Sequence, residues 1–304
     1  MVKDYKTTSD ITIFDRRLVQ KNRQRALNNF NNYGFLFEWS KNQLSERLYD
    51  INRSFDLALQ IGSRAAFTNS EHNKIKRLIT CDLTSQPFTN NAPNYIQSSE
   101  EFLPIVPQSM DLISSNLNLH SVNDLPGALL QIKNSLKKDG LFMASMLGGE
   151  TLHELRTVLT NTELSLTGGI SPRIFPFADK KQMGDLLQRA GFALPVIDSE
   201  IITVTYKSFF KLLHDLRGMG ENNAILQRNK TPVSKDFFMH AAREYHEKYA
   251  QNDGRITASF EVIFLLGWSP HESQQKPLRP GSAKHRLADI LGTDEVTTGE
   301  KTAP

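Results

Sequence analysis

Residues 110–147 read MDLISSNLNLHSVNDLPGALLQIKNSLKKDGLFMASML, and this stretch decides the fold. Its two ends, MDLISSN and GLFMASML, are short apolar runs that are typical of strands buried on both faces of a sheet. The segment between them predicts a helix, because four apolar residues recur on one helical face: Leu125, Leu129, Ile132 and Leu136. A strand, a helix and a second strand in this order indicate parallel strands joined by a crossover helix.

Two more buried strands are predicted upstream, in LALQI at residues 57–61 and in KRLITCD at residues 76–82. A further helix, in PFADKKQMGDLLQRAGF, ends at Gly191. Strands and helices therefore alternate, which predicts an α/β protein with a mostly parallel, doubly wound sheet. After Gly191 two long strands, VIDSEIITVTY and ASFEVIFLLGW, lack a full crossover pattern and predict an antiparallel pair at the sheet edge.

The order of these segments predicts the domain organisation. Two helices precede the first strand and form an N-terminal helical cap over residues 13–52, after a flexible N-terminus at residues 1–12. The α/β domain covers residues 53–271 and contains a helical insertion at about residues 208–256, before the last strand. Residues 272–304 are polar and rich in Pro, Gly and Thr, so we expect a mostly flexible tail there.

Composition argues against several classes of protein. The formal net charge is +3 and the pI is about 8.8, which is too weakly basic to indicate a nucleic-acid partner. The single cysteine, Cys81, excludes an internal disulfide and fits a reducing compartment. The first residues contain no apolar stretch of signal-peptide length, and Asp4 and Asp10 argue against a transit peptide. We therefore expect a cytoplasmic location in a bacterium, and the mitochondrial matrix only if a transit peptide is missing from this chain.

The segment at residues 14–30 predicts a basic, weakly amphipathic helix. Such a helix can make weak peripheral contact with an anionic membrane surface or with a partner. The other interpretation is a solvated basic face that packs on the domain, because five scattered charges do not make a dense polybasic patch. The five charges are Arg16, Arg17, Lys21, Arg23 and Arg25.

Several longer motifs carry a family resemblance. They are NLHSVNDLPGAL, GGETLHELR, GGISPRIFPF, LRGMGE and GWSPHESQ, and the similarity extends from FDRRL at Phe14 to HESQQKP at Pro277. The stretch from Glu100 to Arg156 resembles the middle of a class I S-adenosylmethionine-dependent methyltransferase. Within that superfamily the chain is most similar to the proteins related to mitochondrial complex I assembly factor five and to their alphaproteobacterial counterparts. The resemblance implies a Rossmann-like sheet of seven strands, with helices on both faces and a reversed last strand.

The resemblance places S-adenosylmethionine beside the turn that follows the first strand, in LQIGSRAAF. In the family this turn has an acidic residue and three glycines. Here Gln60 stands at the acidic position and Gly62 keeps the first glycine, whereas Arg64 and Ala66 replace the next two. A side chain at a position that needs positive φ or close ligand approach creates strain or a clash. The turn is therefore either an altered cofactor loop or an ordinary turn in a fold that no longer binds the ligand.

Further cofactor-binding residues follow from the same resemblance. Asp82 stands where the family binds both ribose hydroxyls with a carboxylate, although it could instead cap the following turn. Ser99 takes the place of the adenine-facing acid, with Glu100 next to it. Ser115 and Asn116, at the end of the fourth strand, are expected to line the pocket.

The catalytic residues stay unknown at this point, with three candidates. His120 follows a strand end, where open α/β sheets bind ligands, and can act as a base or pack under the next helix. His271 and Glu272 follow another strand end and match the family. No metal site is predicted, because His240 and His246 are six residues apart, whereas two ligands on one helical face need a spacing of i,i+4.

Charged residues in the family motifs are further candidates: Arg173, Arg217 and Glu221. They can recognise an acidic or peptidic substrate above the sheet. They can equally anchor loops through salt bridges, and the sequence favours neither interpretation.

The sequence therefore supports two functions of different classes. The first is an S-adenosylmethionine-dependent methyltransferase-like protein that acts on a protein substrate, and the family implies a subunit or assembly intermediate of respiratory complex I. Arginine hydroxylation is also associated with the family, although the sequence shows no iron triad that would explain it. The second is a catalytically inactive assembly chaperone, which the altered glycine turn favours. Small-molecule carboxyl methyltransferases of biotin synthesis share only the central stretch.

Overall fold

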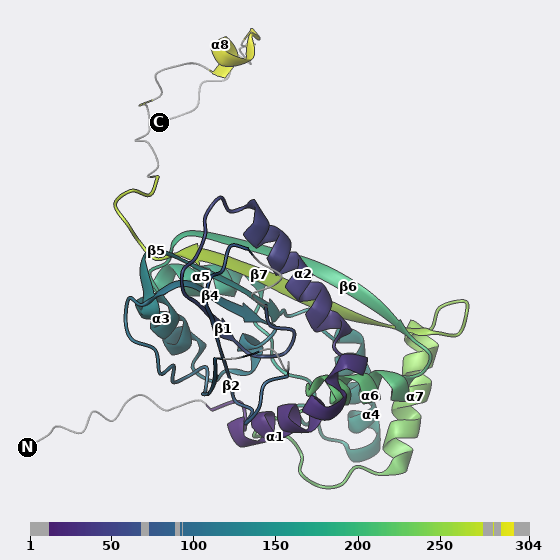
Figure 1. Cartoon of the computed structure of the whole chain (residues 1–304). Helices are drawn as coiled ribbons and strands as arrows, with labels where there is room; N and C mark the ends of the chain where they lie inside the picture. Colours follow the sequence, from purple (N-terminus) through teal and green to yellow (C-terminus); the bar gives the residue numbers. More distant parts are fainter. Residues whose placement is uncertain are drawn as a thin grey trace, which may run out of the picture. The chain divides into compact units, whose positions relative to one another are not determined.

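A computed structural model describes most of the chain and divides it into two compact units, Met1–Pro270 and His271–Pro304. All seven strands belong to the first unit, which contains the helices of the predicted N-terminal cap as well (Figure 1). Residues 1–11, most of the predicted flexible N-terminus, lie outside the described residues, as does much of the predicted tail. The described residues are 12–67, 73–88, 92, 94–275, 282 and 287–294.

The strands form one mixed sheet. Their bounds are β1 Ala58–Ile61, β2 Leu78–Asp82, β3 Tyr95–Gln97, β4 Met110–Asn116, β5 Leu136–Leu147, β6 Ala193–Tyr206 and β7 Ile256–Trp268. In the sheet their order is β3-β2-β1-β4-β5-β7-β6. Strands β1 to β5 run parallel, and β7 is antiparallel to both β5 and β6. The predicted parallel core, the antiparallel final pair and the reversed last strand are therefore confirmed.

Helices cover both faces of this sheet (Figure 1). They are α1 Arg16–Ala26, α2 Phe35–Asp50, α3 Leu125–Ser135, α4 His153–Thr167, α5 Lys180–Arg189, α6 Phe209–Met219, α7 Lys235–Tyr249 and, in the second unit, α8 Leu287–Leu291, with short 3-10 helices η1 Leu27–Asn32 and η2 Leu119–Ser121. Successive strand residues point to opposite faces, so Leu112 and Ile113 enter two different cores. One core joins the sheet to α2, α4, α6 and α7, and the other joins it to α3 and α5. None of the described helices is both long and apolar enough to cross a membrane.

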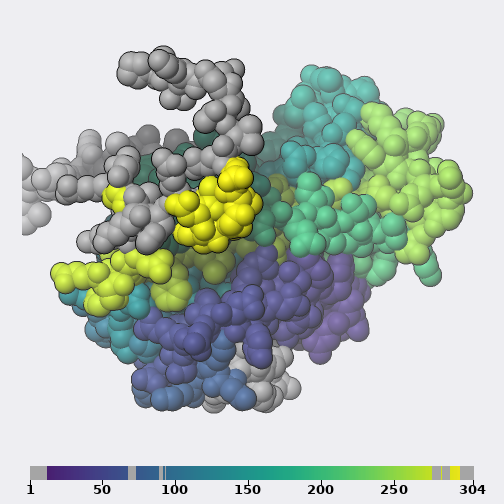
Figure 2. Space-filling model, turned by 90° about the horizontal axis from the view of Figure 1, so that it is seen from above, coloured from purple at the N-terminus to yellow at the C-terminus, as the bar shows by residue number. Residues whose placement is uncertain are grey.

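Helix α1 differs from the helix predicted at residues 14–30. It begins after Asp15, whose side chain accepts a backbone N–H of the first turn, and the 3-10 helix η1 replaces its predicted last turn. The side-chain amide of Asn22 donates a hydrogen bond of 3.4 Å to the carbonyl of Asn222, just after α6. In the space-filling view the purple N-terminal helices adjoin the green residues that follow β6 (Figure 2). Helix α1 thus packs against the helical segment between β6 and β7.

Candidate functional site

The carboxyl ends of β1, β2 and β4 meet at one edge of the sheet. The strand order reverses between β1 and β4, and open α/β sheets bind ligands at such a topological switch point. The register places Gln60 beside Ser114 and Ile61 beside both Ser115 and Cys81. We call this region the switch-point edge, and it gathers most of the predicted cofactor residues: Gln60, Gly62, Asp82, Ser115 and Asn116.

The turn after β1 requires its remaining glycine. Gly62 has a φ of +87°, and its N–H donates to the Cys81 carbonyl at 2.7 Å. A Cβ at this position would lie 2.6 Å from the side chain of Asn118. Strain was expected at Arg64 and Ala66, which replace two glycines, and this prediction is wrong. The positive φ, +48°, instead falls on Ala65, which lies between them. Small Ala65 holds this left-handed conformation, which few residues other than glycine adopt.

The amides of Gln60 and Asn116 are used inside the protein. The hydroxyl of Ser114 donates to Gln60 Oε1 at 2.6 Å. Asn116 Nδ2 donates to the carbonyls of Phe37 and Ala65 at 3.0 and 3.1 Å. Gln60 therefore ties β1 to β4, and Asn116 holds the altered turn and α2 in place.

Two carboxylates lie buried beside this turn. Asp82 Oδ2 accepts from the backbone N–H and the hydroxyl of Ser63, at 2.7 and 2.8 Å. Glu100 Oε1 accepts from Asn118 Nδ2. The hydroxyl of Ser99 instead accepts the N–H of Glu101 at 3.2 Å. Of the predicted cofactor residues Ser99 and Glu100, Glu100 therefore supplies the acidic group of the site.

Arg23 of α1 fills the space between these carboxylates. Its side chain is 1% exposed, with Nη1 at 2.7 Å from Glu100 and 3.4 Å from Asp82. Its Nη2 donates to the carbonyl of Asn118 at 3.3 Å and to the hydroxyl of Ser121 at 3.1 Å. The expectation that the charges of this helix face solvent, a membrane or a partner is wrong for Arg23.

Charge pairing decides the protonation of this cluster. Burial alone would lower the pKa of Arg23, but the carboxylates of Glu100 and Asp82 outweigh it and raise the pKa. Burial would raise the pKa of Glu100, yet Arg23 and Arg16 lower it to about 2. Arg16 contributes a direct ion pair with Glu100. Arg23 and Glu100 are therefore ionised at neutral pH.

This cluster predicts an acid-sensitive fold. The pKa of Glu100 falls from 4.5 to about 2 on folding, so its contribution is complete above about pH 5 and is lost as the pH falls toward 2. Between about pH 6 and about pH 3 we expect Glu100 to account for a loss of about 2 kcal/mol of unfolding free energy. Urea unfolding at both pH values measures it. The variant Glu100→Gln should lose less on acidification than Glu247→Gln, which changes an exposed carboxylate. Equal losses in the two variants would contradict this role.

A second buried cluster joins the altered turn to the segment after α6. The guanidinium of Arg64 donates to Glu221 and lies 4.4 Å from the ring centre of Phe37. The other oxygen of Glu221 lies 3.0 Å from His120 Nε2. Burial would raise the pKa of Glu221, but His120 and Arg64 lower it, so the carboxylate is ionised. The sequence marks Glu221 and His120 separately, and nothing in it marks Arg64 as the partner of Glu221.

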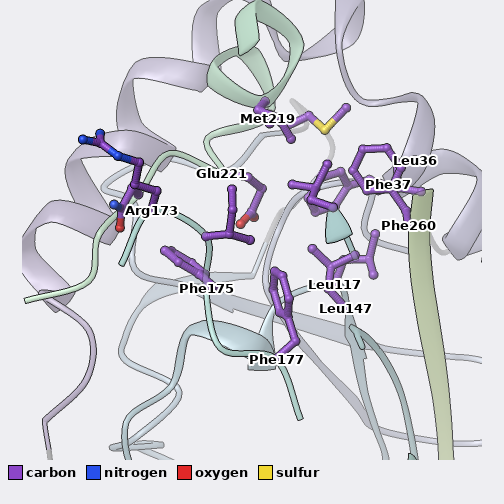
Figure 3. Close-up of a pocket in the computed structure, with 14 residues that line it drawn as sticks. Leu36, Phe37, Leu117, Leu147, Arg173, Phe175, Phe177, Met219, Glu221 and Phe260 are labelled. Carbon is purple, nitrogen blue, oxygen red and sulfur yellow. The ribbon is translucent and has the colours of Figure 1, made fainter. Parts of the chain in front are cut away.

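An apolar pocket lies next to this second cluster. It contains about 500 Å³ of space that no atom fills, part of which is open solvent. Figure 3 shows the carboxylate of Glu221 among apolar side chains, with the guanidinium of Arg173 pointing away. Arg173 instead pairs with Glu163 at 2.8 Å. The walls of the pocket include Leu36, Phe37, Leu117, Leu147, Phe175, Phe177, Met219 and Phe260.

Three candidates remain: Arg217, His271 and Glu272. Arg217 is exposed on α6. His271 and Glu272 belong to the second unit, where a ring nitrogen of His271 lies 2.6 Å from the hydroxyl of Ser273. Their role in catalysis stays a prediction. No group of three or more His, Cys, Asp or Glu residues within the described ranges could hold a metal ion.

The single cysteine of the chain is also close to the switch-point edge. Cys81 lies on β2, is 1% exposed and packs into the core on the side of α3 and α5. Burial raises the pKa of its thiol. A protonated, enclosed thiol is a poor nucleophile, so Cys81 is a structural residue.

The fit of S-adenosylmethionine can be tested at the switch-point edge. Buried polar atoms without a partner in the described structure include Ser115 Oγ and His120 Nδ1, and such atoms favour a ligand or ordered water nearby. Asp82, the position predicted to bind the ribose hydroxyls, does not fit this ligand. The Asp82 carboxylate accepts from Ser63 and pairs with Arg23. Two ligand hydroxyls therefore cannot bind Asp82 while Arg23 holds this position.

Comparison with known proteins decides the family. A family model described as a methyltransferase domain matches residues 6–195. The mitochondrial arginine hydroxylase NDUFAF5 of Danio rerio is 36% identical over 297 residues, which are 95% of this chain and 92% of the relative. The protein of the same name from Homo sapiens is 38% identical over 289 residues, or 92% of this chain and 84% of the relative. The chain belongs to the NDUFAF5 family.

The resemblance to the proteins related to mitochondrial complex I assembly factor five, which the motifs indicated, is thereby confirmed. A malonyl-[acyl-carrier protein] O-methyltransferase of Gallionella capsiferriformans (strain ES-2) is 34% identical over 172 residues, 56% of each chain. Among solved structures, the YcgJ protein of Bacillus subtilis has a TM-score of 0.51 at 16% identity, over 76% of this chain and 98% of that one. The structural similarity shows the class I methyltransferase-like fold alone.

Proposed function

We propose that this chain is an enzyme that modifies an arginine side chain of a protein. Relatives named arginine hydroxylases align with more than nine-tenths of the chain. The methyltransferase domain at residues 6–195 supports S-adenosylmethionine as the ligand of the switch-point edge, where it would supply an activated methyl group. The reaction at the arginine is then either transfer of that group or the hydroxylation that gives the relatives their name.

The contacts of Glu221 carry this proposal. The guanidinium of Arg64, which does not itself line the pocket, stacks on Phe37 and pairs with Glu221, and both of these residues line the pocket. A carboxylate has about four lone-pair sites, and Arg64 and His120 use one on each oxygen. The Glu221 side chain is 11% exposed and lines the pocket. It can therefore accept a second guanidinium from a substrate.

The rest of the pocket suits the stem of an arginine. The aliphatic part of an arginine side chain packs on apolar surface while the charged end seeks a carboxylate. Phe175 and Phe177 supply such a surface on the same side as Glu221 (Figure 3).

The sequence resemblance supports a protein partner from complex I assembly. We propose that the substrate is a subunit or assembly intermediate of respiratory complex I. We further propose that a bacterial chain binds this substrate in the cytoplasm. Relatives that align with more than nine-tenths of the chain are mitochondrial by name. We propose that weak membrane contact of residues 14–30, through the exposed Arg17, Lys21 and Arg25, brings the enzyme near such a substrate.

Mass spectrometry of complex I subunits tests the proposal. Source cells that lack the chain should lose one modified arginine, and the mass difference, one oxygen atom or one CH₂ group, identifies the reaction. The variant Phe177→Ala removes part of the pocket wall and should lower the modified fraction about tenfold, on the order of 1–2 kcal/mol of lost stacking. Phe210→Ala, a control on exposed α6 surface, should change nothing. If no arginine modification depends on the presence of the chain, the proposed enzyme activity is wrong.

A second function is favoured by one observation. Arg23 occupies the carboxylates that a cofactor would need, which suits a methyltransferase-shaped assembly scaffold without catalysis. If the chain is a scaffold, complex I assembly should depend on it and no arginine modification should be found. The variant Phe177→Ala should then restore assembly to the same extent as the unchanged chain.

A further inference from the structure

Helix α1 is held on the switch-point edge mainly by polar contacts. Arg23 and Arg16 pair with Glu100, and Gln20 Nε2 donates to the carbonyl of Leu83 at 2.8 Å. The backbone N–H of Ser85 donates to Gln24 Oε1 at 3.0 Å. These contacts tie one helix to the loops that follow β2 and β3.

The apolar support of α1 is small and separate from the two main cores. A minor cluster joins residues before and within α1 to two loops: Phe14, Val19, Phe175, Ala224 and Ile225. Satellite clusters of this kind open at lower free energy than the main core. At the other end, α1 continues into the 3-10 helix η1, and short 3-10 stretches often serve as hinges. Helix α1 can therefore move while the sheet and its two cores stay folded.

We propose that α1 is a gate on the cofactor site, in which Arg23 occupies the Asp82–Glu100 carboxylates in the closed state and leaves them when a ligand with vicinal hydroxyls binds. This inference rests on the proposed ligand, S-adenosylmethionine. The guanidinium of Arg23 and the two hydroxyls of a ribose are both donors to Asp82, so they compete for one acceptor. The closed state lowers the apparent affinity in proportion to its population.

The gate also reaches the pocket. The ring of Phe14, just before α1, lies 4.8 Å from the ring of Phe175, which lies 6.1 Å from that of Phe177. Both Phe175 and Phe177 line the pocket. Movement of α1 would remove the support behind this wall, so ligand binding at the edge and substrate binding in the pocket are coupled.

Two variants open the gate in different ways. Asn123→Ala removes three hydrogen bonds to Ile13 and Phe14, which hold the segment before α1, and it leaves Asp82, Glu100 and the arginines unchanged. Arg23→Gln removes the competing guanidinium itself. Their matched controls are Asn161→Ala and Arg25→Gln, which change exposed residues of the same types.

Calorimetric titration with S-adenosylhomocysteine is the first test. We expect the apparent Kd to fall about tenfold in Asn123→Ala and at least as much in Arg23→Gln, with both controls equal to the unchanged chain. Hydrogen exchange supplies a second measurement. The amides of Ile13 and Phe14 donate to Asn123, and that of Asp15 donates to the carbonyl of Ala224, so all three should exchange faster when the ligand is bound.

The outcomes separate the gate from the proposed ligand. Equal Kd values in all five proteins, with unchanged exchange at residues 13–15, would overturn the gate and leave the ligand in place. No binding by any of them, at millimolar concentration, would overturn both. If Arg23→Gln does not fold, Asn123→Ala decides alone.

Discussion

Replacing Glu221 by alanine is expected to lower the free energy of unfolding by about 3–5 kcal/mol. Glu221 is the charge partner of Arg64, whose side chain is 0% exposed. Burial already lowers the pKa of Arg64, and without Glu221 the guanidinium would stay buried without its carboxylate. Removal of one partner of a buried ion pair costs far more than the pair itself contributes. Urea unfolding of the variant and the unchanged chain measures the difference.

A control and a double variant sharpen this experiment. Arg217→Ala, four residues earlier but exposed, should stay within about 0.5 kcal/mol of the unchanged chain. The double variant Arg64→Met with Glu221→Leu removes both charges and should recover much of the lost stability. A cost below about 1 kcal/mol for Glu221→Ala would show that the pair does not stabilise the turn after β1.

The second large effect is expected for Gly62→Ala, at about 2–5 kcal/mol of lost unfolding free energy. Its φ of +87° strains any residue with a Cβ, and that Cβ would come within 2.6 Å of Asn118. Asn118 could not move freely, because its amide donates to Glu100 and its carbonyl accepts from Arg23. The substitution should therefore disturb the switch-point edge as well as the turn.

Gly168→Ala separates the two causes. Gly168 also has a positive φ, +70°, but a Cβ there meets nothing within 4 Å. It should therefore show the backbone strain alone, about 1–2 kcal/mol. Thermal unfolding and S-adenosylhomocysteine titration should be run on both variants. Equal destabilisation would mean that close packing against Asn118 contributes nothing.

The sequence predicted the sheet well where the strands are uniformly apolar. The runs at β1, β2, β4 and β5 are buried on both faces, and such runs are visible without an alignment. Strand β3, Tyr95–Gln97, was missed because it has three residues and is half exposed. The place of β7 between β5 and β6 is set by long-range pairing, which no local pattern encodes.

The candidate site was predicted in outline and missed in its centre. Positions such as Gly62 and Asp82 were found because a strand end and a family motif mark them. Arg23 and Arg64 were not, because their charges look like those of a solvated helix and of a loop. Their partners are far away in sequence: Arg23 and Asp82 are separated by 59 residues, and Arg64 and Glu221 by 157. A buried arginine is recognised only once its carboxylates are placed.

The enclosed Cys81 gives this protein an internal reporter. Its thiol packs on the side of α3 and α5, and the next residue, Asp82, faces Arg23. Displacement of α1 would uncover Asp82 and leave Cys81 covered, whereas unfolding would expose the thiol. A maleimide or Ellman reagent should therefore label Cys81 only in molecules that have lost the sheet. Because the chain has no other cysteine, a dye on Arg25→Cys would follow the helix alone, with no native thiol to remove first.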